Sequence, residues 1–176
     1  MLTLYHLFPR AYVPEDEVPF EKAEYLDRRN RVWVDRDRLL LSETPCRGWA
    51  VFSEVLYNRL VDVALDLIGG VLITDVVIFA PSTPSYLFIK RGTEVGIVEA
   101  SGASVIPLVR EGETVEEGNR VFYVITRKKE VRVIRARRRG VVVYVSDIVP
   151  SVPTKYLALI VGEELVRRLT AVSACR

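Results

Sequence analysis

Hydrophobic residues in the second half of the chain form short runs separated by turn residues. Eight such runs fall between residues 71 and 161: VLITDVVIFA, SYLFIK, EVGIVEA, SVIPLVR, RVFYVIT, EVRVIRA, VVVYVSDIV and KYLALIV. They are separated by turn signals such as PSTP, Arg91-Gly92 and Ser101-Gly102. Many short strands at this spacing are typical of a β-barrel or β-sandwich. We therefore expect a mostly β fold, α+β overall.

Two segments have a helical pattern instead. The first, near residues 53–68, has Ser53 as a candidate N-cap and Gly69-Gly70 as a stop. Its apolar residues recur at helical spacing: Leu56, Leu60, Val63, Ala64 and Leu67. The second segment, GEELVRRLTAVSA, begins with acidic residues that suit a helix N-terminus. The pattern predicts an N-terminal α+β extension over 1–89, a β domain over 90–161 and a C-terminal helix over 162–176.

Composition limits the classes of function. Apolar residues make up 49% of the chain and charged residues 27%, as in folded globular proteins. The chain has no apolar run of about 18 residues, and its first residues do not resemble a signal peptide. We expect a cytoplasmic protein with no membrane partner. The absence of Gln, with only three Asn and one Met, is the direction expected of a thermophile.

Candidate catalytic and metal-binding residues are few. His6 is the only histidine, and we expect it to be structural. Cys46 and Cys175 lie far apart and do not make a disulfide framework. We find no nucleophile–base pair, metal cluster or phosphate loop, which argues against an enzyme and against a metal site. Chemistry carried by carboxylates alone stays open, because spacing does not show which Asp and Glu meet.

Charge divides the chain into an acidic and a basic half. Residues 1–89 have a net charge of −4, and residues 90–176 have a net charge of +6. The excess of positive charge is concentrated in eight cations: Arg127, Lys128, Lys129, Arg132, Arg135, Arg137, Arg138 and Arg139.

Three of these arginines alternate in sequence. Arg135, Arg137 and Arg139 would lie on one face of a strand. Such a surface could bind an acidic protein partner or, with Tyr123 and Tyr144 stacking on bases, a nucleic acid. The alternative is that the cations are structural and pair with the nearby acidic residues Glu111, Glu113, Glu116 and Glu117.

The stretch LVREGETVEEGNRVFYVITRKKEVRVIRARRRGVVVYV resembles the core of biotinyl/lipoyl carrier domains. The resemblance is carried by the glycine loop from Glu111 to Asn119, with Gly112 and Gly118, and by Gly140. It implies a flattened β-barrel over residues 90–161, in which strands 121–126 and 131–136 pair across a tip at 128–130. It also implies that Lys128, or alternatively Lys129, is the attachment residue for biotin or lipoate.

The residues around the tip differ from those of carrier domains. Arg127 and Lys129 flank Lys128 where biotinyl domains have methionines, and lipoyl domains usually have an acidic residue before the lysine. Along its whole length the chain is also similar to an uncharacterised archaeal family with a biotinyl/lipoyl-like core behind an N-terminal extension.

These observations favour a non-catalytic carrier-like or protein-interaction module that carries no prosthetic group and exposes an unmodified Lys128. One alternative is a biotin or lipoate carrier with Lys128 as the acceptor. Another is a nucleic-acid-binding accessory domain that uses the Arg-rich hairpin 127–139, with Arg127, Arg132, Arg135, Arg137, Arg138 and Arg139 as its binding surface. The pattern does not identify the partner, the pathway or the oligomeric state.

Overall fold

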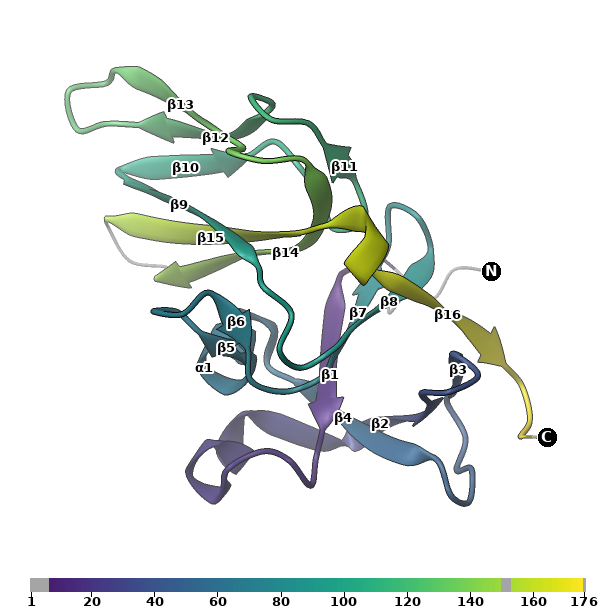
Figure 1. The fold of residues 1–176 in the computed structure, drawn as a ribbon. Coiled ribbons are helices and arrows are strands. Elements are labelled where there is room, and N and C mark those ends of the chain that lie inside the picture. The colour runs from purple at the N-terminus through teal and green to yellow at the C-terminus, as the bar shows by residue number, and fades with distance from the viewer. Residues whose placement is uncertain (1–6, 150–152, 176) are drawn as a thin grey trace.

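The computed structural model describes residues 7–149 and 153–175 and consists mainly of β-strands (Figure 1). The expected mostly β class is confirmed. One part is a closed seven-stranded barrel, and the other consists of two small sheets packed on each other. No helix within the two described ranges is long and apolar enough to cross a membrane. His6 lies outside those ranges.

The barrel is built from both ends of the chain. Its strands follow the order β1-β4-β2-β3-β16-β8-β7, and β1 pairs with β7 to close it. They are β1 (Arg10–Pro14), β2 (Leu26–Asp35), β3 (Leu40–Ser42), β4 (Ala50–Val55), β7 (Val76–Ala80), β8 (Ser85–Ile89) and β16 (Arg167–Val172). The expected α+β extension is therefore most of a barrel, and the C-terminal strand joins β3 to β8.

The segment between β8 and β16 forms the two packed sheets. One has the order β10-β12-β13 and the other the order β11-β14-β15-β9. Their strands are β9 (Gly96–Gly102), β10 (Ser104–Pro107), β11 (Thr114–Val115), β12 (Arg120–Ile125), β13 (Val131–Arg135), β14 (Gly140–Val149) and β15 (Thr154–Val161). The predicted antiparallel pairing of the segments 121–126 and 131–136 is confirmed by the register of β12 and β13.

The four-stranded sheet lies between two hydrophobic cores. On one face, Val142, Ala158 and Ile160 pack against the three-stranded sheet. On the other face, Val143 and Leu159 pack in a core shared with the barrel. A sheet covered on both faces needs nearly continuous apolar strands, which explains the runs VVVYV and YLALIV. The three-stranded sheet has this support on one face only.

The helix predicted near residues 53–68 is wrong for most of its length. Residues 50–55 form β4, which pairs with both β1 and β2, and the α-helix α1 covers only Leu60–Ala64. The other short elements here are η2 (Phe20–Tyr25), η3 (Tyr57–Arg59), β5 (Leu65–Asp66) and β6 (Val71–Leu72). Ser53 is not an N-cap, since it is fully buried and donates a hydrogen bond to Glu15. Barrel pairing outweighs the local helical spacing because it buries Phe52 and Val55.

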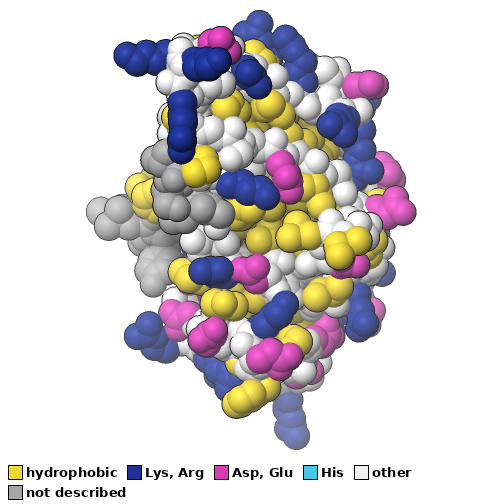
Figure 2. All heavy atoms as spheres, turned by 90° about the vertical axis from the view of Figure 1, so that its left-hand side faces the viewer, with side chains coloured by type: hydrophobic (Ala, Val, Ile, Leu, Met, Phe, Trp, Pro, Cys, Tyr) yellow, Lys and Arg dark blue, Asp and Glu magenta, His cyan; other side chains and the backbone are white. Residues whose placement is uncertain are grey.

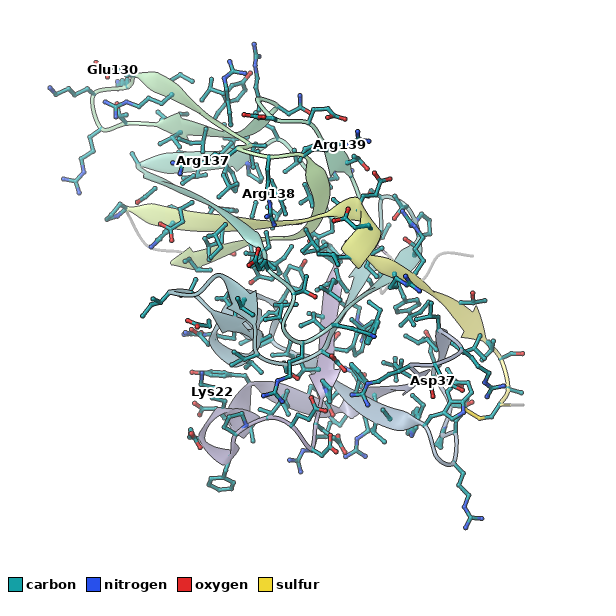
Figure 3. The ribbon with its side chains drawn as sticks, in the orientation of Figure 1. Lys22, Asp37, Glu130, Arg137, Arg138 and Arg139 are labelled. Carbon is teal, nitrogen blue, oxygen red and sulfur yellow. A yellow bond between two sulfur atoms is a disulfide. The ribbon has the colours of Figure 1, made fainter. Side chains whose placement is uncertain are left out.

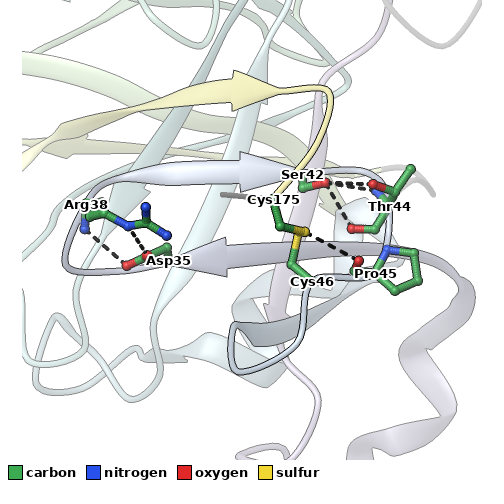
Figure 4. The surroundings of a disulfide bond; sticks show 7 residues. All are labelled: Asp35, Arg38, Ser42, Thr44, Pro45, Cys46 and Cys175. Atoms are coloured by element: carbon green, nitrogen blue, oxygen red, sulfur yellow. Dashed lines mark hydrogen bonds and ion pairs between the residues drawn. A yellow bond between two sulfur atoms is a disulfide. The ribbon is translucent and has the colours of Figure 1, made fainter.

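The C-terminal helix predicted over residues 162–176 is also wrong. A single turn of 3-10 helix, η4 (Glu163–Leu165), retains the acidic start, and β16 follows it. Leu169 is buried in the barrel core, where a strand can pair with β3 and β8 at once. Cys175 then forms a disulfide with Cys46 (Figure 4), with their Cα atoms 5.7 Å apart. The two cysteines, 129 positions apart in sequence, meet only because β16 closes the barrel.

Candidate functional site

The β12–β13 hairpin ends in a tight turn that exposes its lysines. The backbone N–H and C=O of Thr126 bond Glu130 O and Lys129 N, each at 2.9 Å, which leaves a three-residue loop of Arg127, Lys128 and Lys129. Lys129 has φ of +63°, the left-handed conformation usual for the last residue of such loops. Arg127, Lys128 and Lys129 are all exposed, so the expected exposure of Lys128 is confirmed. Lys128 thus stands at the end of a narrow hairpin that another protein could surround.

The glycine loop before the hairpin has the predicted conformation. Gly112 and Gly118 have φ of +93° and +88°, values that a residue with a Cβ rarely adopts. Val115, between them, is buried in the core between the two sheets. The loop thus closes one end of this core and leads into β12.

Most of the eight cations have no acidic partner in the part of the chain that the structure describes. Only Arg132 and Arg139 have a carboxylate within 4 Å among the described residues: Arg132 faces Glu130, and Arg139 faces Glu116 and Glu163. Figure 2 shows cationic side chains gathered at the end of the molecule that carries the hairpin. Of the four glutamates predicted to neutralise the cations, Glu116 alone lies within 4 Å of one of them in the described chain, so the surface keeps a positive charge.

The alternation predicted that Arg135, Arg137 and Arg139 share one face of a strand, but the strand ends before two of them. Strand β13 ends at Arg135, and Arg137 and Arg138 lie in a bend that leads to the other sheet (Figure 3). The bend is needed because Ala136 is buried between the sheets and β14 begins at Gly140.

The arginines around the bend make different contacts. Arg135 and Arg137 border a groove of about 360 Å³ beside Ile97 and Glu99 of β9. Arg138 donates hydrogen bonds to backbone carbonyls, at 3.0 Å to Ile160 O and 3.4 Å to Glu94 O. Arg138 therefore fastens the bend to β15, whereas Arg135 and Arg137 stay available to a partner.

Tyr144 cannot stack on a nucleic-acid base, contrary to the prediction. It is completely buried, its hydroxyl donates a 2.7 Å hydrogen bond to Tyr57 O, and the two rings lie 4.9 Å apart. Tyr123 is partly exposed on β12, and its hydroxyl lies 3.0 Å from the Arg120 guanidinium, which donates to it. One aromatic side chain thus stays accessible among the cations.

The sequence did not single out the buried group that Tyr57 forms with Glu111. The Tyr57 hydroxyl donates a hydrogen bond to the Glu111 carboxyl, which is only 6% exposed. Burial raises the pKa of Glu111, and burial together with the nearby Glu111 carboxyl raises the pKa of Tyr57. Ser82 adds a 2.6 Å bond to Glu111 O. These contacts join the barrel to the glycine loop, which indicates a structural role.

A cleft of about 650 Å³ lies beside this junction. Phe79 and Tyr86 of the barrel border it, together with Arg110 and Glu111 of the glycine loop. The Glu111 carboxyl is already bonded by the Tyr57 hydroxyl. Arg110 contributes a positive charge to the lining of the cleft. No set of three His, Cys, Asp or Glu side chains within 7–149 and 153–175 is placed to hold a metal ion.

The exposed aliphatic residues of the three-stranded sheet were also missed. Ile106, Leu108, Val131 and Val133 have exposed fractions between 36% and 63%. The alternation of Val131 and Val133 with Arg132 is visible in the sequence and predicts a strand, but it does not show that this face is exposed. Their exposed fractions show that the described chain leaves them largely uncovered, and the strand register places Ile106, Val131 and Val133 in one sheet.

Comparison with known families gives one match. The model of an archaeal family described as "uncharacterized protein conserved in archaea (DUF2118)" matches residues 6–163, which include β1 to β15 and therefore all of the two packed sheets. No curated protein matches the chain.

Proposed function

Because this chain belongs to that archaeal family of uncharacterized proteins, we propose its function from its own geometry: it is a non-catalytic protein-interaction module that binds an acidic partner through the β12–β13 hairpin. The observation that carries the proposal is the lack of acidic partners around the hairpin. Arg127, Lys128 and Lys129 at the tip have no carboxylate within 4 Å among the described residues. A cluster of like charges costs free energy in the isolated protein, and an acidic partner would remove that cost.

The experiment compares the full chain with a charge-reversed variant, Lys128→Glu with Lys129→Glu, as baits in an extract of the native host. We expect an acidic protein to bind the wild type, to be released by salt, and to be lost with the variant. The complex is then rebuilt from purified proteins and its Kd measured. Arg28→Glu with Arg47→Glu, two exposed cations of the barrel region, makes the same charge change elsewhere. Binding that survives reversal at the tip but not in the barrel would contradict the proposal.

The second candidate is a biotin or lipoate carrier, favoured by the position of Lys128 on a narrow, exposed turn after a glycine loop. Arg127 and Lys129 beside it are unlike the neighbours that the carrier resemblance implies, so we expect an unmodified lysine. Intact mass of the protein isolated from its host decides the question. A biotinyl or lipoyl increment that disappears with Lys128→Ala would establish the carrier function instead.

A nucleic-acid partner is the third candidate. It retains the cations and Tyr123 but loses the predicted stacking by Tyr144. Binding of mixed RNA or DNA at low salt, with a salt slope that flattens in Arg135→Ala with Arg137→Ala, would establish it. We expect no such binding, because the exposed aliphatic residues beside the cations have no use in phosphate recognition.

A further inference from the structure

The outer face of the β10-β12-β13 sheet is apolar. Paired residues on neighbouring strands project from the same face of a sheet. The register places Ile106, Tyr123 and Val133 side by side in one row, and Ser104, Ile125 and Val131 in the next. Side chains of the opposite set, such as Phe122 and Val124, are buried in the core between the two sheets. The two rows therefore point away from the core.

This face is unusual for an antiparallel sheet next to water. Such sheets normally place polar residues on the solvent side. Here Val131 is 63% exposed, Ile106 is 44% exposed and Val133 is 36% exposed. Contiguous exposed aliphatic side chains on a folded protein mark an interaction site more often than scattered single ones do.

Two arginines lie at the end of this apolar face that is farthest from the hairpin turn. Arg120 and Arg135 are direct partners in the register of β12 and β13, and both are exposed. Like charges directly opposite each other destabilise a sheet. In the described chain neither has a carboxylate within 4 Å: Arg120 donates to the Tyr123 hydroxyl, and Arg135 donates to Gly118 O at 2.9 Å. Each guanidinium keeps further N–H donors, so one carboxylate could bind both.

The opposite end of the face is also cationic. The rows end at the turn of Arg127, Lys128 and Lys129, beyond Ile125 and Val131. Glu130, the residue that follows this turn, is acidic and lies 3.8 Å from Arg132. An apolar strip that includes Tyr123 and ends at a pair of arginines resembles a protein-binding surface, whose buried core is apolar and in which aromatic residues and arginine are enriched.

We infer that this outer face binds a partner segment in which aliphatic residues are flanked by Asp or Glu at both ends. The inference rests on the proposed function and names the chemistry of its partner. A carboxylate of the segment binds between Arg120 and Arg135. Its aliphatic residues cover the row of Ile106, Tyr123 and Val133, and a second acidic residue meets the hairpin turn.

A second copy of this chain is a poorer occupant. In a two-fold contact the same surface is presented by both molecules. The cation clusters that bracket the face would then meet the same clusters, beside which the described chain offers Glu130, already 3.8 Å from Arg132. Charge complementarity therefore favours a different, acidic chain.

The test uses the full chain as bait for a phage-displayed library of short random peptides. We expect the selected peptides to carry aliphatic residues between acidic ones. Val133→Ser should weaken a selected peptide by about tenfold or more, since it removes one of the two aliphatic side chains of the row of Ile106, Tyr123 and Val133. Arg135→Gln should weaken it by about tenfold as well, because a charge-assisted hydrogen bond is lost. Both residues are exposed, so neither substitution affects the core.

Two matched variants control for general effects. Ile73→Ser removes an aliphatic side chain that is 43% exposed in another part of the molecule, and Arg47→Gln removes an exposed barrel-region cation. Both should leave peptide binding unchanged. If neither Val133→Ser nor Arg135→Gln weakens binding more than these controls do, the inference is overturned.

The outcomes separate this inference from the proposed function. Selection of acidic peptides without aliphatic residues, unaffected by Val133→Ser, would leave the acidic-partner function in place and overturn the inference. Self-association of the chain that Val133→Ser abolishes would overturn it in favour of a homo-oligomer. If no peptide is selected, the inference also falls, while the host-extract experiment still decides the proposed function.

Discussion

The barrel and the three-stranded sheet use arginine in different ways. Six arginines before residue 60 are paired with a carboxylate of the same chain: Arg10, Arg29, Arg31, Arg36, Arg38 and Arg59. Several also pack over aromatic rings, such as Arg38 over Trp49. In the three-stranded sheet, Arg120 and Arg135 face each other without a carboxylate in the described chain. These six arginines are thus paired with acidic residues of the same chain, whereas the two of the sheet bond only uncharged groups among the described residues.

The two regions also differ in how they are closed. The barrel is completed by a strand from the far end of the chain and fixed by the disulfide between Cys46 and Cys175. The three-stranded sheet ends in β13, which pairs with β12 on one side and with no strand of the described chain on the other. An unpaired strand edge is a place where another chain can bind.

The largest expected effect comes from removing the disulfide that ties the C-terminal end of the chain to the barrel. Cys46→Ser with Cys175→Ser should lower the free energy of unfolding by about 4 to 5 kcal/mol, because the link closes a loop well over 100 residues long. Guanidinium unfolding measures the change. Hydrogen exchange should rise in β16 and β3 and stay unchanged in β12 and β13.

Reduction provides the control for that experiment. A reducing agent should lower the stability of the wild type to that of the double variant and leave the double variant unaffected. Equal stability of the oxidised and reduced wild type would show that the barrel does not depend on the link.

A smaller effect is expected at the junction between the two regions. Burial raises the pKa of Glu111, so the folded state resists ionisation of this carboxyl while the unfolded state does not. Its contribution to stability is therefore present below the ordinary pKa of a glutamate and is lost as pH rises through the raised value. Glu111→Gln keeps an acceptor for Tyr57 and does not ionise. We expect the variant to match the wild type near pH 4 and to be more stable by about 1 to 2 kcal/mol at pH 8.

The measurement is urea unfolding across this pH range. Glu117→Gln, an exposed glutamate of the same loop, is the matched control and should show no pH-dependent difference from the wild type. If the Glu111→Gln variant instead becomes less stable than the wild type as pH rises, the ionised carboxylate of Glu111 is stabilised at the junction.

The hairpin could be predicted from sequence because its determinants are local. The strands flanking Lys128 and Lys129 are adjacent in sequence, and the nearby Gly112 and Gly118 mark positions of positive φ. The barrel could not be predicted from sequence, because one of its strands comes from residues 167–172 and pairs with residues 40–42 and 85–89. Pairing over such a distance leaves no signal in a single sequence. The same long-range contact brings Cys175 to Cys46.

The candidate site was predicted in part. The cations near the tip could be identified from their density, and their exposure follows from their position in a turn. The positions of Arg137 and Arg139 relative to each other could not be predicted, because they depend on the bend between the two sheets. The apolar face was hidden for another reason: alternation of Val131 and Val133 with arginine shows that a strand has two faces, but not which of them is covered.

The smallest expected effect tests the arginine comparison itself. Arg120→Thr removes one of two like charges that face each other and introduces a good strand former, so it should raise the free energy of unfolding by about 0.3 kcal/mol at low ionic strength. Arg31→Thr is the matched change in the barrel, where Arg31 lies 3.0 Å from the Glu15 carboxylate. It should lower stability by about 0.5 to 1 kcal/mol. Salt should shrink both differences, because it screens the repulsion in one region and the attraction in the other.

If both substitutions destabilise equally, Arg120 has a favourable role within the chain, and the contrast between a self-sufficient barrel and a partner-binding sheet does not hold. A stability gain in Arg120→Thr that coincides with weaker binding of a selected peptide would show directly that the sheet retains an unfavourable charge pair for the sake of its partner.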